Sequence, residues 1–91
     1  FLSTEVIPSA HPFNTSTMIS YHLPIKSYIT LTVHDLQGRE VARILDQQQE
    51  PGFHSLQWDG FKHDGPAASG VYLYQIQTES STKVGKMILL R

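Results

Sequence analysis

Residues 28–38 read Tyr-Ile-Thr-Leu-Thr-Val-His-Asp-Leu-Gln-Gly, and this stretch decides the fold class. Its apolar residues Ile29, Leu31 and Val33 alternate with polar ones, so an extended chain would have one apolar side and one polar side. Alternation with a period of two is typical of a half-buried β-strand. The segment 35–38 that follows has an acceptor at its first position and glycine at its last, as a tight turn requires. The stretch therefore predicts a strand that ends in a turn.

The same alternation recurs in the segments 17–23, 54–59 and 71–78, and glycine or proline interrupts the chain about every eight to twelve residues. Short strands at this spacing predict an all-β fold, an Ig-like antiparallel β-sandwich of about seven strands. A tyrosine that enters a late strand after Ser-Gly, at 69–70, is typical of the tyrosine corner of such sandwiches. The inward faces predict a structural core of Ile19, Tyr21, Leu31, Val33, Leu56, Trp58, Tyr72 and Tyr74.

Two regions fit the alternation less well. Between residues 39 and 45, Val41 and Ile44 are three apart, which predicts a β-bulge or a strand that ends early. Residues 46–52 include three consecutive glutamines, and we expect a longer, solvated loop there. Residues 1–9 are expected to be the tail of a linker, and residues 10–91 to form the domain.

The last segment, 82–91, carries more apolar residues than one buried face needs. Met87 and Leu89 are expected to point into the core, which leaves Ile88 and Leu90 on the opposite side. An apolar surplus of this kind is typical of a surface that another protein covers. The candidate residues for recognition of a partner are Lys86, Ile88, Leu90 and Arg91.

Composition narrows the classes of function. The 91 residues suffice for one domain, and we expect a monomer. The formal net charge is −1, so no basic field attracts nucleic acid. No apolar run approaches the roughly 20 residues that a membrane-spanning helix needs, so we expect no membrane insertion. The chain has no cysteine and therefore no disulfide or thiolate metal site.

Five histidines, at positions 11, 22, 34, 54 and 63, raise the question of a metal site. They show neither the His-x-His nor the His-x3-His spacing, so we expect no metal and no cofactor. His22 and His34 fall on predicted outer faces of two strands, where they could be neighbours, but solvated histidines are the favoured reading. His54 is expected to be a hydrogen-bonded histidine at the edge of the core.

The carboxylates give no stronger indication of chemistry. Asp59 and Asp64 could contribute to a calcium site, but turn-stabilising aspartates that bond to their own backbone are favoured. The sequence has no Gly-x-Ser-x-Gly motif and no evident base near a serine, so we expect no enzyme. Tyr28 and Phe61 are the aromatic residues most free to be exposed. If they lined one flat face, they would favour a carbohydrate-binding module as an alternative.

Four segments in order carry a resemblance to a known family. Residues 11–24 open with His-Pro-Phe-Asn, residues 29–41 contain the strand and turn described above, and residues 52–60 end in Trp-Asp-Gly. Residues 68–74 read Ala-Ser-Gly-Val-Tyr-Leu-Tyr, and the chain closes with Lys-Met-Ile-Leu-Leu-Arg. Together they resemble the type A C-terminal sorting domain of the type IX secretion system, whose fold is similar to the Ig-like domain of the flagellar hook-cap protein. The residues that flank Pro-Phe-Asn, namely Ala10, His11 and Thr15, depart from the family pattern.

The resemblance implies a function and a set of partners. Such a domain directs an upstream cargo domain of the same polypeptide across the outer membrane to the cell surface. Its partner is the secretion machinery of that membrane, and its location is the periplasm in transit, then the cell surface or the extracellular medium. A passive Ig-like spacer or assembly module, as in the hook-cap relative, stays open as an alternative.

Overall fold

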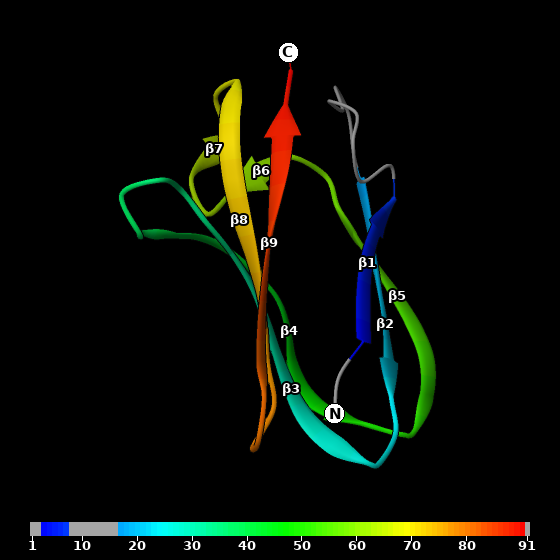
Figure 1. The fold of residues 1–91 in the computed structure, drawn as a ribbon. Coiled ribbons are helices and arrows are strands. Elements are labelled where there is room, and N and C mark those ends of the chain that lie inside the picture. Colours follow the sequence, from blue (N-terminus) through cyan, green and yellow to red (C-terminus); the bar gives the residue numbers. More distant parts are fainter. Residues whose placement is uncertain (1–2, 8–16, 91) are drawn as a thin grey trace.

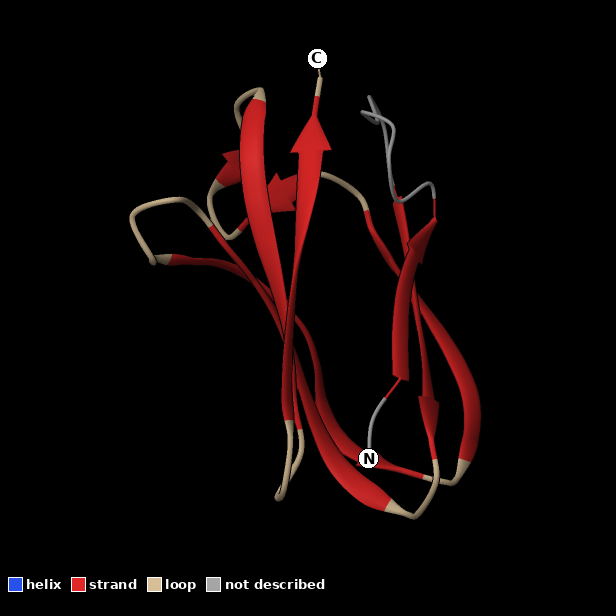
Figure 2. Ribbon diagram, viewed as in Figure 1, coloured by secondary structure: helices blue, strands red, loops and turns tan. Residues whose placement is uncertain are grey.

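The computed structural model describes residues 3–7 and 17–90, and every regular element within these ranges is a β-strand (Figure 2). None of the elements in the described ranges is a helix long and apolar enough to cross a membrane.

Two antiparallel sheets form the two layers of a sandwich (Figure 1). The three-stranded sheet has the order β1-β2-β5, with β1 at Ser3–Ile7, β2 at Thr17–Leu23 and β5 at Gly52–Trp58. The four-stranded sheet has the order β4-β3-β8-β9, with β4 at Glu40–Gln49, β3 at Ser27–His34, β8 at Gly70–Gln77 and β9 at Thr82–Leu89. A small hairpin joins β6 (Phe61–Lys62) to β7 (Gly65–Pro66). The predicted all-β sandwich is confirmed.

The core lies between the two sheets. It is formed by the inward residues of five strands and one loop residue, namely Ile19, Tyr21, Leu23, Ile29, Leu31, Val33, Trp58, Ala67, Tyr72, Tyr74, Ile76, Met87 and Leu89. Trp58 meets the ring of Tyr72 edge-on, with ring centroids 5.3 Å apart, and its Nε1 donates a hydrogen bond to the carbonyl oxygen of Phe61. The predicted core is confirmed except at Leu56, which is only partly buried and packs against the cluster.

Strand β4 contains two bulges. Leu31 pairs with Leu45 and the next residue of β3, Thr32, pairs with Arg43, so Ile44 is skipped in the register. A second shift, between Val33 and His34, skips Val41 in the same way. Both skipped residues are partly buried against the core, which explains their three-residue spacing and confirms the predicted bulge.

Two sequence expectations are wrong in this part of the fold. The glutamines at 47–49 lie in β4 and pair with β3, so the expected loop shrinks to residues 50–51. The run has no apolar alternation because β4 is an edge strand, held there by its backbone ladder. The linker tail expected at residues 1–9 contains β1, which pairs with β2 along its whole length.

Candidate functional site

Strand β9 forms one edge of the four-stranded sheet. Among the described strands it pairs with β8 alone. Strand β1 lies close to β9 at this edge of the sandwich, although it belongs to the other sheet (Figure 1). The backbone of β9 therefore has a side that no described strand covers with a hydrogen-bonded ladder.

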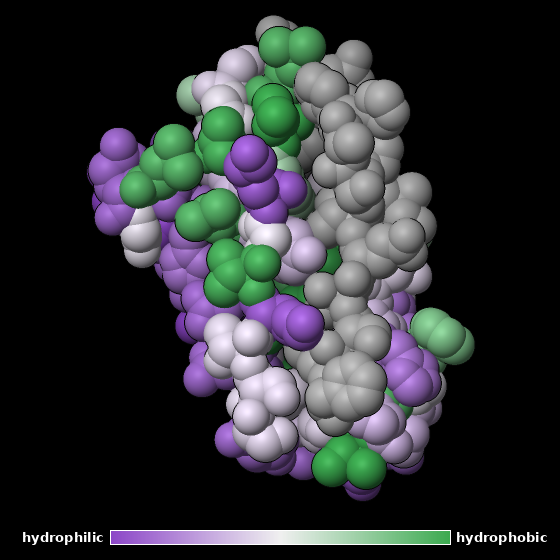
Figure 3. All heavy atoms as spheres, in the orientation of Figure 1, coloured by the Kyte–Doolittle hydropathy of each residue, from purple (hydrophilic) through white to green (hydrophobic). Residues whose placement is uncertain are grey.

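The side chains of β9 separate into a buried row and an exposed apolar row. Met87 and Leu89 are buried, as predicted, whereas Ile88 and Leu90 are 39% and 58% exposed. Val84, at 59% exposure, belongs to the same outward row. We call Val84, Lys86, Ile88 and Leu90 the β9 strip, and in Figure 3 hydrophobic residues follow β9 along this face.

Of the residues predicted to recognise a partner, the structure brings Lys86, Ile88 and Leu90 together on this face, and Arg91 lies outside the described residues. Val84 was missed by the sequence reasoning. Val84 could have been found from its position, because it lies two residues before Lys86 and therefore on the same side of the strand.

The apolar surface extends from β9 onto β8. Val71 lies directly opposite Ile88, and Leu73 lies opposite Lys86, both on the outward face and both half-buried. Val71 also lines an open hollow of about 330 Å³ between the β3–β4 turn and the start of β8, together with the exposed Leu36. The β9 strip is thus continuous with a shallow depression at one end of the sheet.

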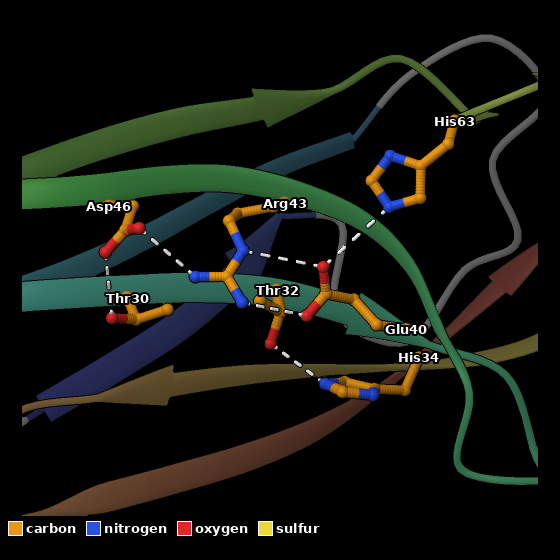
Figure 4. A network of polar contacts seen from close by, with 7 residues as sticks. All are labelled: Thr30, Thr32, His34, Glu40, Arg43, Asp46 and His63. Carbon is orange, nitrogen blue, oxygen red and sulfur yellow. Dashed lines mark hydrogen bonds and ion pairs between the residues drawn. The ribbon is translucent and has the colours of Figure 1, made fainter.

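The opposite half of the same face, on β3 and β4, is polar (Figure 4). Arg43 donates to Glu40 Oε1 at 3.1 Å and to Asp46 Oδ2 at 3.2 Å, and His63 Nε2 lies 3.7 Å from Glu40. The pKa of the Asp46 carboxyl is lowered, mainly by hydrogen bonding with Tyr28 and to a smaller extent by the nearby Arg43 charge. Desolvation of the carboxyl opposes this shift in part. The hydrogen bond and charge of Glu40 raise the pKa of Arg43. The charged side chains on β4 and His63 thus pair with one another. The apolar part of this sheet face lies on β9 and the adjoining β8.

The β3–β4 turn that borders the hollow is held by Asp35. Its Oδ1 accepts hydrogen bonds from the backbone N–H groups of Gln37 and Arg39, both at 3.0 Å, and its Oδ2 accepts one from Arg39 Nε at 2.8 Å. Partial burial opposes ionisation, but the backbone and side-chain hydrogen bonds from Arg39 lower the pKa of Asp35. Gly38 closes the turn with φ of 87°, as the predicted turn requires.

The histidines within the described ranges do not converge. His22 lies in β2 and packs against Phe53, whereas His34 lies in β3 of the other sheet and bonds with Thr32, so the two are not neighbours on one face. His54 stacks on Tyr21, and its Nε2 lies 2.7 Å from the carbonyl oxygen of Glu50, which confirms a hydrogen-bonded histidine at the core edge. His11 lies outside the described residues, as does the Pro-Phe-Asn motif. Within the described ranges no three acidic or histidine side chains gather as metal ligands would.

The two aspartates considered for calcium have other contacts. Asp59 Oδ1 accepts a hydrogen bond from the backbone N–H of Phe61 at 3.0 Å, which confirms the expected turn-stabilising role. Asp64 pairs with Lys62, with 3.7 Å between Nζ and Oδ1.

The two aromatic residues proposed for sugar stacking do not share a face. Tyr28 and Phe61 are exposed, at 42% and 48%. Tyr28 stands at the beginning of β3, however, and Phe61 stands in β6 at the other end of the sandwich (Figure 1). The flat aromatic platform on which the carbohydrate-binding alternative depends is not formed by this pair.

The architecture is that of an Ig-like module. The Tyr72 hydroxyl at the start of β8 donates a hydrogen bond of 2.6 Å to the carbonyl oxygen of Ala68, four residues upstream, which is the contact of a tyrosine corner. The family model of the FlgD Ig-like domain matches residues 14–82. The chain therefore belongs to the FlgD Ig-like domain family, a family of non-catalytic modules.

The chain is also similar to a solved structure. FlgD from P. aeruginosa is 30% identical to this chain, with a TM-score of 0.61. The match covers 78% of this chain and 59% of the FlgD chain, so the domain spans less than two thirds of that protein. No curated protein matches the chain.

Proposed function

We propose that this domain is a sorting signal that directs an upstream protein of the same polypeptide across the outer membrane through the type IX secretion system. The domain itself performs no catalysis, and the secretion machinery recognises its folded surface. On this proposal it passes through the periplasm and ends at the cell surface or in the medium.

The observation that carries the proposal is the β9 strip. Single exposed apolar residues are common on protein surfaces and need no explanation. Val84, Ile88 and Leu90 are different because they form one row on an edge strand and continue onto the apolar residues of β8. A contiguous apolar patch with a polar border is typical of a protein-binding surface. The family match ends at residue 82, where β9 begins, so the strip lies outside the part that this chain shares with the family model.

The test is a reporter fusion. Residues 1–91 are placed behind a periplasmic reporter protein in a host that has a type IX system, and the exported fraction is measured. We expect the fused domain to export the reporter, and Ile88→Ser to retain most of it in the periplasm. Ile25→Ser is the matched control, since Ile25 is 66% exposed in the turn between β2 and β3, away from the strip.

Ile25→Ser removes a mostly exposed side chain and should change the free energy of unfolding by no more than about 0.5 kcal/mol. Ile88 is 39% exposed and lies in a strand, so Ile88→Ser should cost about 1–2 kcal/mol, and urea denaturation checks that this variant is folded. Equal export of the two variants would show that the strip is not what the machinery reads. Retention of the unmodified fusion would contradict the sorting function.

A second candidate is a passive spacer or assembly module. The family match favours it, because the matched family is described by its Ig-like fold and its description names no sorting role. Retention of the reporter by every fusion, with the domain folded, would favour this candidate over the first.

A further inference from the structure

Charge is distributed unevenly between β9 and the rest of the chain. Residues 82–91 contain Lys83, Lys86 and Arg91 but no aspartate or glutamate, although the whole chain has eight acidic residues against seven basic ones. Lysines on an edge strand often prevent unwanted pairing of sheet edges. Here, however, Lys86 stands between the exposed Val84 and Ile88, and an edge that only repels other strands would not place apolar side chains on both sides of it.

We propose that the partner of the β9 strip is an extended protein segment that adds to the edge of β9 and alternates apolar residues with one acidic residue. This inference rests on the proposed function, because it specifies the partner that reads the same strip. An added strand hydrogen-bonds through its backbone, and its alternate side chains give specificity. Strand β9 has an edge with no ladder to any described strand, and β1 approaches it without pairing.

The register defines the side chains that the partner needs. Residues directly opposite in a ladder have their Cβ atoms about 4.5–5.5 Å apart. An antiparallel partner would therefore place apolar residues opposite Leu90, Ile88 and Val84, and a carboxylate opposite Lys86. Read along the partner, its outward residues follow the order apolar, apolar, acidic, apolar.

A second copy of this chain is a poorer occupant of the same edge. The charged residues of segment 82–91 are all basic, so pairing β9 with another β9 offers no carboxylate to Lys86 in any register, and some registers place lysine opposite lysine. Like charges that lie opposite each other destabilise a ladder. Charge complementarity thus favours an acidic segment of a different protein.

The test uses synthetic peptides on the folded chain. The probe is Val-Thr-Val-Thr-Glu-Thr-Val, and the matched control has lysine in place of glutamate. We expect the glutamate peptide to bind about tenfold more tightly than the lysine peptide, because the change replaces an attractive pair with a repulsive one. Lys86→Glu should reverse this preference. Only alternate residues of an added strand turn their N–H groups toward β9, so two further peptides are needed, one N-methylated at the three threonines and one at the residues between them, and the peptide whose methylated amides face β9 should lose binding.

Equal affinity for the two peptides, or an unchanged preference in Lys86→Glu, would overturn the inference. Dimerisation of the chain through β9, detected by sedimentation and lost in Ile88→Ser, would also overturn it. If the glutamate peptide does not bind while Ile88→Ser still blocks export, the sorting function stands and the inferred partner chemistry is wrong. If the peptide binds as expected but the unmodified fusion is retained in the periplasm, the sorting function alone fails.

Discussion

The ring of Tyr74 lies against Gly85, its register partner on β9, and occupies the space that a Cβ atom at position 85 would need. Tyr74 is buried, so the pair closes the core beneath the edge that carries the β9 strip. An aromatic ring over a cross-strand glycine is a recognised way to cover an edge glycine. The position of β9 on the sandwich therefore depends on a contact between these two residues.

We predict that Gly85→Ala lowers the free energy of unfolding by about 1–3 kcal/mol, the usual cost of overpacking a well-filled site. The added methyl group overlaps the ring of Tyr74, so either the ring must move or β9 must tilt away from it. Urea denaturation followed by tryptophan fluorescence measures the change. In a Tyr74→Leu background the same alanine should cost much less, and an equal cost in both backgrounds would show that the ring is not the obstacle.

Removal of the Tyr72 hydroxyl should also destabilise the fold. Tyr72→Phe deletes the hydrogen bond to the carbonyl oxygen of Ala68, at a cost of about 0.5–1.5 kcal/mol. The ring and its edge contact with Trp58 are retained, so the loss reports the hydroxyl alone. Urea midpoints of the variant and the unmodified chain at neutral pH give the difference. An unchanged midpoint would mean that the corner contact contributes nothing to stability.

The same chemical change at Tyr21 should not lower the stability of the fold. The Tyr21 hydroxyl is buried and has no hydrogen-bond partner among the residues that the structure describes, so its desolvation is not compensated. We expect Tyr21→Phe to leave stability unchanged or to raise it by up to about 1 kcal/mol. It is the matched control for Tyr72→Phe, because both variants remove one buried phenolic oxygen. A loss at Tyr21 as large as that at Tyr72 would reveal a partner that the structure does not show.

Most of the fold could be predicted because its inner strands are buried on one side only. In β3 and β8, alternation fixes which residues face the core, and a bulge was the expected result of the spacing between Val41 and Ile44. The turn at Asp35 was predictable for a similar reason, since its acceptor and its glycine are local signals.

What the sequence could not predict depends on pairing between distant residues. The glutamines of β4 and the whole of β1 lie at sheet edges, where the backbone ladder gives no periodic signal in the side chains. Membership of one sheet or the other is likewise not local, which is why His22 and His34 looked like possible neighbours. Part of the β9 strip could be predicted, because Ile88 and Leu90 are more apolar residues than one buried face needs. The contact between Tyr74 and Gly85 could not be predicted, because it depends on the register of β8 and β9.

Alkaline pH should unfold the domain partly through Tyr21. Burial raises the pKa of Tyr21 from 10.0 to about 12. Between these values the unfolded chain has released the phenolic proton while the folded chain still holds it, so stability falls as pH rises. One such proton corresponds to about 1.4 kcal/mol per pH unit, or about 2–3 kcal/mol over this window.

Tyr21→Phe should remove this part of the pH dependence. Urea unfolding at several pH values from about 9 to about 12 would show a flatter profile for Tyr21→Phe than for the unmodified chain. Hydrogen bonding to Asp46 also raises the pKa of the exposed Tyr28, but Tyr28 is present in both proteins and its effect cancels in the difference. Parallel profiles would mean that the Tyr21 hydroxyl reaches solvent or a partner in the folded state, which would also remove the basis for the stabilisation expected from Tyr21→Phe.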